Sequence, residues 1–119
     1  MKKVIFTTFI IVVLAACKAV ILAVPAQSDV DRVKDKYPNY TLAELQKGKK
    51  LYELKCQACH GLKNPRKESE EEWREIVPEM VQKAKKKKGI IVSAEEEEAI
   101  LKYVITMSSA PKISKESNK

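Results

Sequence analysis

The sequence predicts an all-α fold, because it contains three strong helix-start signals and no stretch that alternates clearly enough for a sheet. Each signal pairs a hydroxyl residue with a glutamate three positions later, in Thr41-Leu-Ala-Glu44, Ser69-Glu-Glu-Glu72 and Ser93-Ala-Glu-Glu96. In such a capping box the hydroxyl accepts a hydrogen bond from the third amide of the helix, and the glutamate reaches back to the first residue. We therefore expect helices near residues 41–56, 69–88 and 93–108.

The N-terminus has the pattern of a secretory signal. The basic start Met1-Lys2-Lys3 precedes an apolar run that reaches Cys17 and is interrupted only by Thr7 and Thr8. This apolar run is too short to span a bilayer comfortably. The sequence therefore predicts export to the bacterial periplasm or cell envelope, where thiols are normally oxidised.

Two processing sites follow this signal. Leu14-Ala15-Ala16-Cys17 resembles a bacterial lipobox, in which the cysteine becomes the lipidated first residue, whereas Val24-Pro25-Ala26 resembles an ordinary cleavage site with an unfavourable proline. A third cysteine in an exported chain needs an explanation, so lipidation of Cys17 is preferred over a chance cysteine in a longer signal. We predict a signal peptide over residues 1–16 and a membrane anchor at Cys17.

The chain between this anchor and the first capping box is polar and ends in Tyr37-Pro38-Asn39. Residues 17–40 are therefore expected to form a tether, residues 41–110 the folded domain, and residues 111–119 a disordered polar tail. Apolar residues recur at helical spacing in each expected helix: Leu42, Leu45, Gly48 and Tyr52; Trp73, Val77, Met80, Val81 and Ala84; Ile100, Leu101, Val104 and Ile105. These stripes make a modest core, which a large apolar cofactor would complete.

The charges exclude one class of partner. The net charge is +7, with a basic block at Lys83 and Lys85–Lys88 and acidic blocks at Glu70–Glu72 and Glu95–Glu98. A basic block without interleaved aromatic residues, in an exported chain, is a poor nucleic-acid site. The helix dipole explains acids at helix starts and lysines at a helix end, while docking to an acidic protein surface is the sharper hypothesis.

The stretch KCQACHG contains Cys56, Cys59 and His60, the only histidine in the chain. A structural zinc site needs four ligands and the sequence offers no second cluster, while a thioredoxin-like dithiol needs a βαβ context. C-x-x-C-H is instead the c-type haem attachment motif. Two cysteines on one helical turn can meet the vinyl groups of the porphyrin, and the next histidine is directed at the iron. The motif predicts one covalently attached haem c.

The region from Leu42 to Val104 resembles the small, often lipid-anchored bacterial class I c-type cytochromes with a single haem. GKKLYELKCQACHGL matches the helix that leads into the haem motif, and EEEEAILKYV matches the last helix, which crosses the first. The resemblance implies about three main helices around the haem, electron transfer with redox protein partners, and no enzymatic activity. It also implies that Gly48 and Tyr52 pack against Ile100 and Tyr103.

The same resemblance implies a methionine ligand between the haem motif and the last helix. Met80 is the residue in that position, with His60 as the proximal ligand, although the intervening segment lacks the long methionine loop of larger members. Trp73 and Val77 share its helical face and are expected to pack on the haem. Three alternatives remain open for the sixth position: Met107, a lysine, or an open site, with Met80 then only filling the core. An open site would indicate a haem-based enzyme or gas sensor instead, and the chain can also serve as the haem-bearing subunit of a larger complex.

Overall fold

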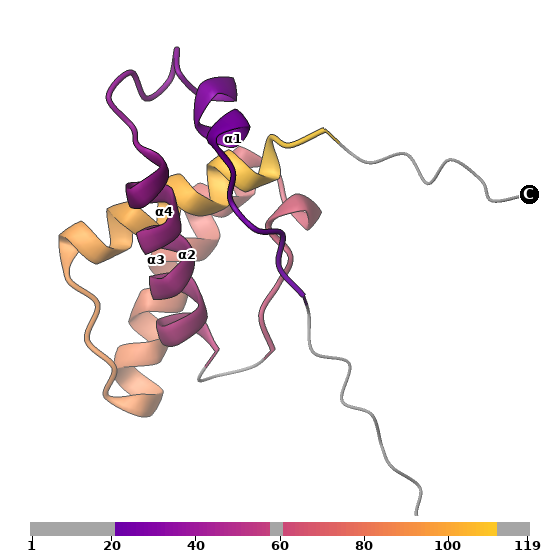
Figure 1. The fold of residues 1–119 in the computed structure, drawn as a ribbon. Helices are drawn as coiled ribbons and strands as arrows, with labels where there is room; N and C mark the ends of the chain where they lie inside the picture. Colours follow the sequence, from indigo (N-terminus) through magenta and orange to yellow (C-terminus); the bar gives the residue numbers. More distant parts are fainter. Residues whose placement is uncertain (1–20, 58–60, 112–119) are drawn as a thin grey trace, which may run out of the picture.

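The computed structural model describes residues 21–57 and 61–111, and every regular element within these residues is a helix. The elements are α1 (Gln27–Arg32), α2 (Leu42–Cys56), the 3₁₀ helix η1 (Pro65–Lys67), α3 (Glu70–Lys88) and α4 (Ala94–Ser108) (Figure 1). This confirms the all-α prediction. Cys17, Cys59, His60 and the expected tail from residue 112 lie outside the described residues.

The three long helices begin where the capping boxes place them. The hydroxyls of Thr41, Ser69 and Ser93 accept from the third amides of α2, α3 and α4 at 3.2, 3.2 and 3.1 Å. The glutamates at these third positions accept in return from the backbone amides of the capping residues. The sequence-based helix boundaries therefore hold to within one residue.

Helices α2 and α4 cross in close contact at Gly48. A Cβ atom at Gly48 would lie 2.4 Å from the carbonyl oxygen of Ala99 and 2.7 Å from the Cβ of Tyr103, so no larger residue fits without a shift. One turn later on α2, the ring of Tyr52 lies 5.5 Å from that of Tyr103, and both residues share the core with the fully buried Ile100. The predicted contact between these helices is confirmed.

The core forms around this crossing and extends to α3. Trp73 meets Tyr52 edge-on, with ring centroids 6.1 Å apart. The largest fully buried side chains are Trp73, Tyr52, Tyr103, Leu45, Ile100, Ile105, Val104 and Thr106. Because α2 and α3 both pack on α4, the end of α2 and the middle of α3 are held in a fixed relation.

The prediction of a tether over residues 17–40 is wrong for its described part. Leu22, Val30 and Val33 are buried, and the first two join the hydrophobic core. The folded domain therefore begins at Leu22 or earlier, not at residue 41. A polar segment with three well-spaced apolar residues can pack if neighbouring helices satisfy its polar groups.

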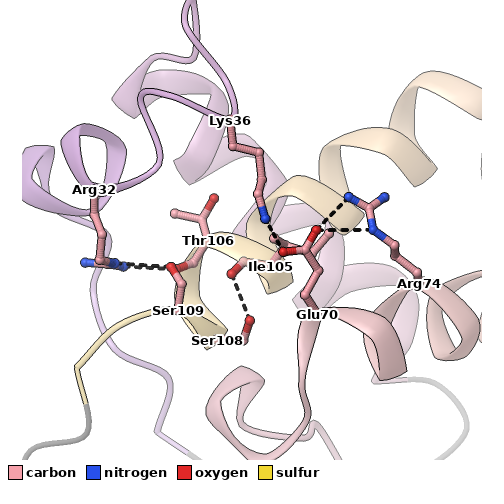
Figure 2. Close-up of polar contacts among 8 residues, drawn as sticks. All are labelled: Arg32, Lys36, Glu70, Arg74, Ile105, Thr106, Ser108 and Ser109. Atoms are coloured by element: carbon pink, nitrogen blue, oxygen red, sulfur yellow. Dashed lines mark hydrogen bonds and ion pairs between the residues drawn. The ribbon is translucent and has the colours of Figure 1, made fainter.

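Figure 2 shows how α1 and the turn after it are held. The Arg32 guanidinium donates to the backbone oxygen of Thr106 at 2.9 Å and to Ser109 Oγ at 3.2 Å, both at the end of α4. Lys36 pairs with Glu70 at the start of α3. These contacts join the N-terminal segment to the two last helices.

In the described part of the chain, no helix is long and apolar enough to cross a membrane.

Candidate functional site

The site predicted from the sequence begins where α2 ends. Cys56 is the last residue of α2, and Gln57 continues its right-handed helical conformation with φ −70° and ψ −18°. The Cys56 side chain is half-buried and packs against the hydrophobic core. The helix therefore presents the first cysteine of the motif at the edge of the core, while Cys59 and His60 follow within residues 58–60, outside the described part.

Two buried aromatic side chains fix the chain where it leaves the motif. The Tyr52 hydroxyl donates a hydrogen bond to the backbone oxygen of Lys63 at 2.7 Å. The indole N–H of Trp73 donates one to the backbone oxygen of Pro65 at 2.8 Å. Burial raises the pKa of Tyr52, and the nearby Cys56 raises it further, so the phenol stays protonated and keeps donating. The helical pattern identified both residues as apolar, but it did not predict that their polar atoms position this segment.

Met80 lies opposite the end of the motif. It lines a hollow of about 250 Å³ together with Gly61, the residue that directly follows His60. The other lining residues are Lys63 from the same segment and Ile76, Glu79 and Lys83 from α3. Met80 is only half-buried, and α3 continues through Pro78 without interruption. The structure thus brings Met80 to the same hollow as Gly61, although the two are well separated in the sequence.

The other residues expected near the haem have different positions. Trp73 and Val77 are 0% and 2% exposed and lie in the core among protein side chains. Ile76 lines the hollow beside Met80, and the sequence pattern did not identify it as a site residue. Met107, the alternative ligand, is buried in the core at the end of α4.

Apolar surface remains uncovered around the end of α2. Leu54 is 69% exposed, and Ile91, in the connection between α3 and α4, is 71% exposed. The Lys55 ammonium donates to the backbone oxygen of Ile91 at 3.0 Å, which brings that connection to the last turn of α2. The neighbouring Leu62 and Val92 are only partly buried. The described protein atoms therefore leave this end of the domain less covered than the helix crossing.

The basic block forms the exposed end of α3. Lys85–Lys88 occupy its last turn, where positive charge meets the negative end of the helix dipole. Lys83 pairs with Glu79 one turn earlier, beside the hollow that contains Met80. A positively charged surface thus borders the candidate site.

Comparison with known proteins identifies the N-terminus. Residues 1–17 match the family model of the prokaryotic membrane lipoprotein lipid attachment site. No curated protein and no solved structure matches the chain. The match ends at Cys17, the cysteine predicted to be lipidated, so the chain carries a lipid attachment site of the kind found in bacterial envelope lipoproteins.

Proposed function

We propose that this lipoprotein transfers electrons in the bacterial cell envelope, through one haem c attached to Cys56 and Cys59. One structural observation carries the proposal beyond the motif itself. Met80 shares a hollow with Gly61, the neighbour of His60 in the sequence. A histidine and a methionine, contributed from opposite sides of one site, are a common axial pair in c-type cytochromes.

The described residues fit such a group. Cys56 lies half-buried at the end of α2, while Ile76 and Met80 give the hollow an apolar wall. The exposed Leu54 and Ile91 would gain cover from a flat apolar ring system beside them. Cys56 and Cys59 would form the thioethers, and His60 and Met80 would bind the iron. Bound haem supplies one-electron redox chemistry.

The remaining residues of the site act by positioning. Tyr52 and Trp73 hold the carbonyls of Lys63 and Pro65, so the backbone that follows His60 has a fixed course. Thioether ligation by Met80 would raise the reduction potential and favour the ferrous state. The lysines at the end of α3 would steer acidic redox partners towards this side of the domain.

A test of this proposal starts from the lipoprotein purified from its native membrane. We expect haem staining that survives denaturing electrophoresis and acid–acetone extraction, and a low-spin spectrum that carbon monoxide leaves unchanged. Haem that extracts freely, or stoichiometric zinc, would contradict the proposal. Carbon monoxide binding by the unmodified protein would instead favour the haem-based enzyme or gas sensor, because the sixth position would be open.

A further inference from the structure

Very little chain separates the lipid anchor from the folded domain. The anchor is at Cys17, and Leu22, only five residues later, is buried at 7% exposure in the core. The four residue steps from Cys17 to Ile21 reach at most roughly 14 Å when fully extended. This reach is about half the thickness of the hydrocarbon core of a bilayer. The domain therefore cannot move far from the membrane surface, whatever conformation these residues adopt.

The segment nearest the anchor presents apolar side chains to the outside. Leu22 and Pro25 are buried against the domain, whereas Ile21, Ala23 and Val24 point away from it. Ile21 is 89% exposed and Val24 81%, the two highest values among the large hydrophobic residues that the structure describes. Apolar residues at this place are costly in water but are stabilised at the boundary between lipid headgroups and acyl chains.

Basic residues flank this apolar surface. Val24 borders a hollow that is also lined by Lys49, Lys50 and Glu53 of α2. Lys49 pairs with Glu53, whereas Lys50 is exposed. In the sequence, Lys18 directly follows the lipidated cysteine. Lysines beside an apolar segment favour membranes that contain anionic phospholipids.

We propose that Ile21, Ala23, Val24 and Lys50 form a membrane-contact face, which rests on the anionic phospholipid bilayer that carries the anchor. The domain is then held in one orientation relative to the membrane and does not rotate freely at the end of a long tether. In Figure 1 the connection between α3 and α4 lies on the opposite side of the domain from the segment that leads into α1. This inference depends on the anchor and the described fold, and it holds with or without haem.

Photo-crosslinking in native membranes tests the membrane-contact face. A benzophenone amino acid replaces Val24 in the full lipidated chain, and in a matched chain it replaces Ile91, which is similarly exposed at 71%. After illumination, mass spectrometry measures the yield of phospholipid adducts. We expect a yield several-fold higher from position 24 than from position 91. Equal yields, or adducts to protein alone at position 24, would overturn the proposal.

A variant with altered charges shows whether the membrane-contact face itself touches the bilayer or position 24 is labelled only because it lies near the anchor. Ile21→Glu combined with Lys50→Glu places two carboxylates against the anionic surface. We expect this variant to lower the adduct yield at position 24 several-fold, with thermal unfolding unchanged because both side chains are exposed. Ile91→Glu is the control and should leave the yield at position 24 unaltered. If the double variant also leaves it unaltered, the face does not contact the membrane.

Discussion

The crossing of α2 with α4 and the surroundings of the last turn of α2 differ in how completely protein side chains cover them. At the crossing with α4, Tyr52, Ile100 and Tyr103 are at most 1% exposed. Near the C-terminal end of α2, Leu54 is 69% exposed, and Ile91, whose backbone Lys55 contacts, is 71% exposed. Packing between helices accounts for the sequence at the crossing. At the other end, it accounts neither for the apolar residues nor for the position of Met80.

This difference indicates which end of the domain the proposed haem would cover. A domain of this size buries a limited fraction of its surface, so a bound apolar group beside the C-x-x-C-H motif would add to its core. The crossing would hold α2 in place, and the haem would complete the core at the other end. Each prediction below alters one of these regions, and the first has the largest expected effect.

Removing both attachment cysteines should have the largest effect. Cys56→Ala with Cys59→Ala removes both thioethers, so we expect no haem stain on a denaturing gel and a large loss of thermal stability by circular dichroism. The matched control is Leu54→Ala at an exposed position of the same helix, which should keep the haem. A double variant that retains covalent haem would show that the cysteines do not attach it.

The next prediction concerns the sixth ligand. If Met80 binds the iron of the proposed haem, Met80→Ala should convert low-spin to high-spin iron, lower the reduction potential and allow carbon monoxide to bind, because alanine has no thioether. Met107→Leu is the control, since Met107 is a buried core residue that leucine replaces at similar volume. If Met80→Ala retains a native-like low-spin spectrum, Met80 only packs beside Gly61.

At the crossing, Gly48→Ala should destabilise the domain by about 2–3 kcal/mol, because the new Cβ meets backbone that cannot move independently. Urea unfolding measures this difference. Gly61→Ala is the matched control, since a Cβ there meets no described atom within 4 Å, and a change within about 0.5 kcal/mol is expected. Equal losses in the two variants would mean that the close approach of α2 and α4 does not limit stability.

The hydroxyl of Tyr52 links the two regions. Tyr52→Phe keeps the ring in the core but leaves the carbonyl of Lys63 without its donor, so a loss of about 1–2 kcal/mol in the free energy of unfolding is expected. Tyr103→Phe provides the control, because among the described residues its hydroxyl donates no hydrogen bond. A loss no larger than that of the control would remove Tyr52 from the positioning of this segment.

The sequence predicted the three long helices because each one starts with its own capping box and carries its own apolar stripe. It did not predict α1, where Asp29 accepts from the amide of Ala26 but no hydroxyl residue caps the start. Contacts with Thr106 and Ser109, far away in the sequence, hold that segment, and no local pattern reveals them. Contacts between residues far apart in the sequence also explain why the pattern did not predict the whole candidate site. The motif identified Cys56, whereas the hollow that Gly61 and α3 line together depends on how the helices pack.

The smallest expected effect concerns the ion pairs of Glu70, of which the pair with Lys36 joins the N-terminal segment to α3. Hydrogen bonds from Lys36 and then Arg74 lower the pKa of Glu70 below its usual value of 4.5 (Figure 2). A lowered pKa means that the ionised carboxylate stabilises the fold above pH 4.5, and this stabilisation is lost as the pH falls through the folded value. Because Glu70 is partly exposed, Glu70→Gln should cost only about 0.5 kcal/mol at neutral pH and low salt.

Urea unfolding of the two proteins between about pH 3 and pH 7 checks this prediction, since the difference between them should vanish at the acidic end and shrink in high salt. Glu75→Gln is the matched control on α3, because Glu75 forms no ion pair within the described residues. A cost that grows on acidification, or an equal cost for Glu75→Gln, would show that these pairs do not stabilise the N-terminal segment. The burial of Leu22 and Val30 would then hold it in place, and the short reach between anchor and domain would be unchanged.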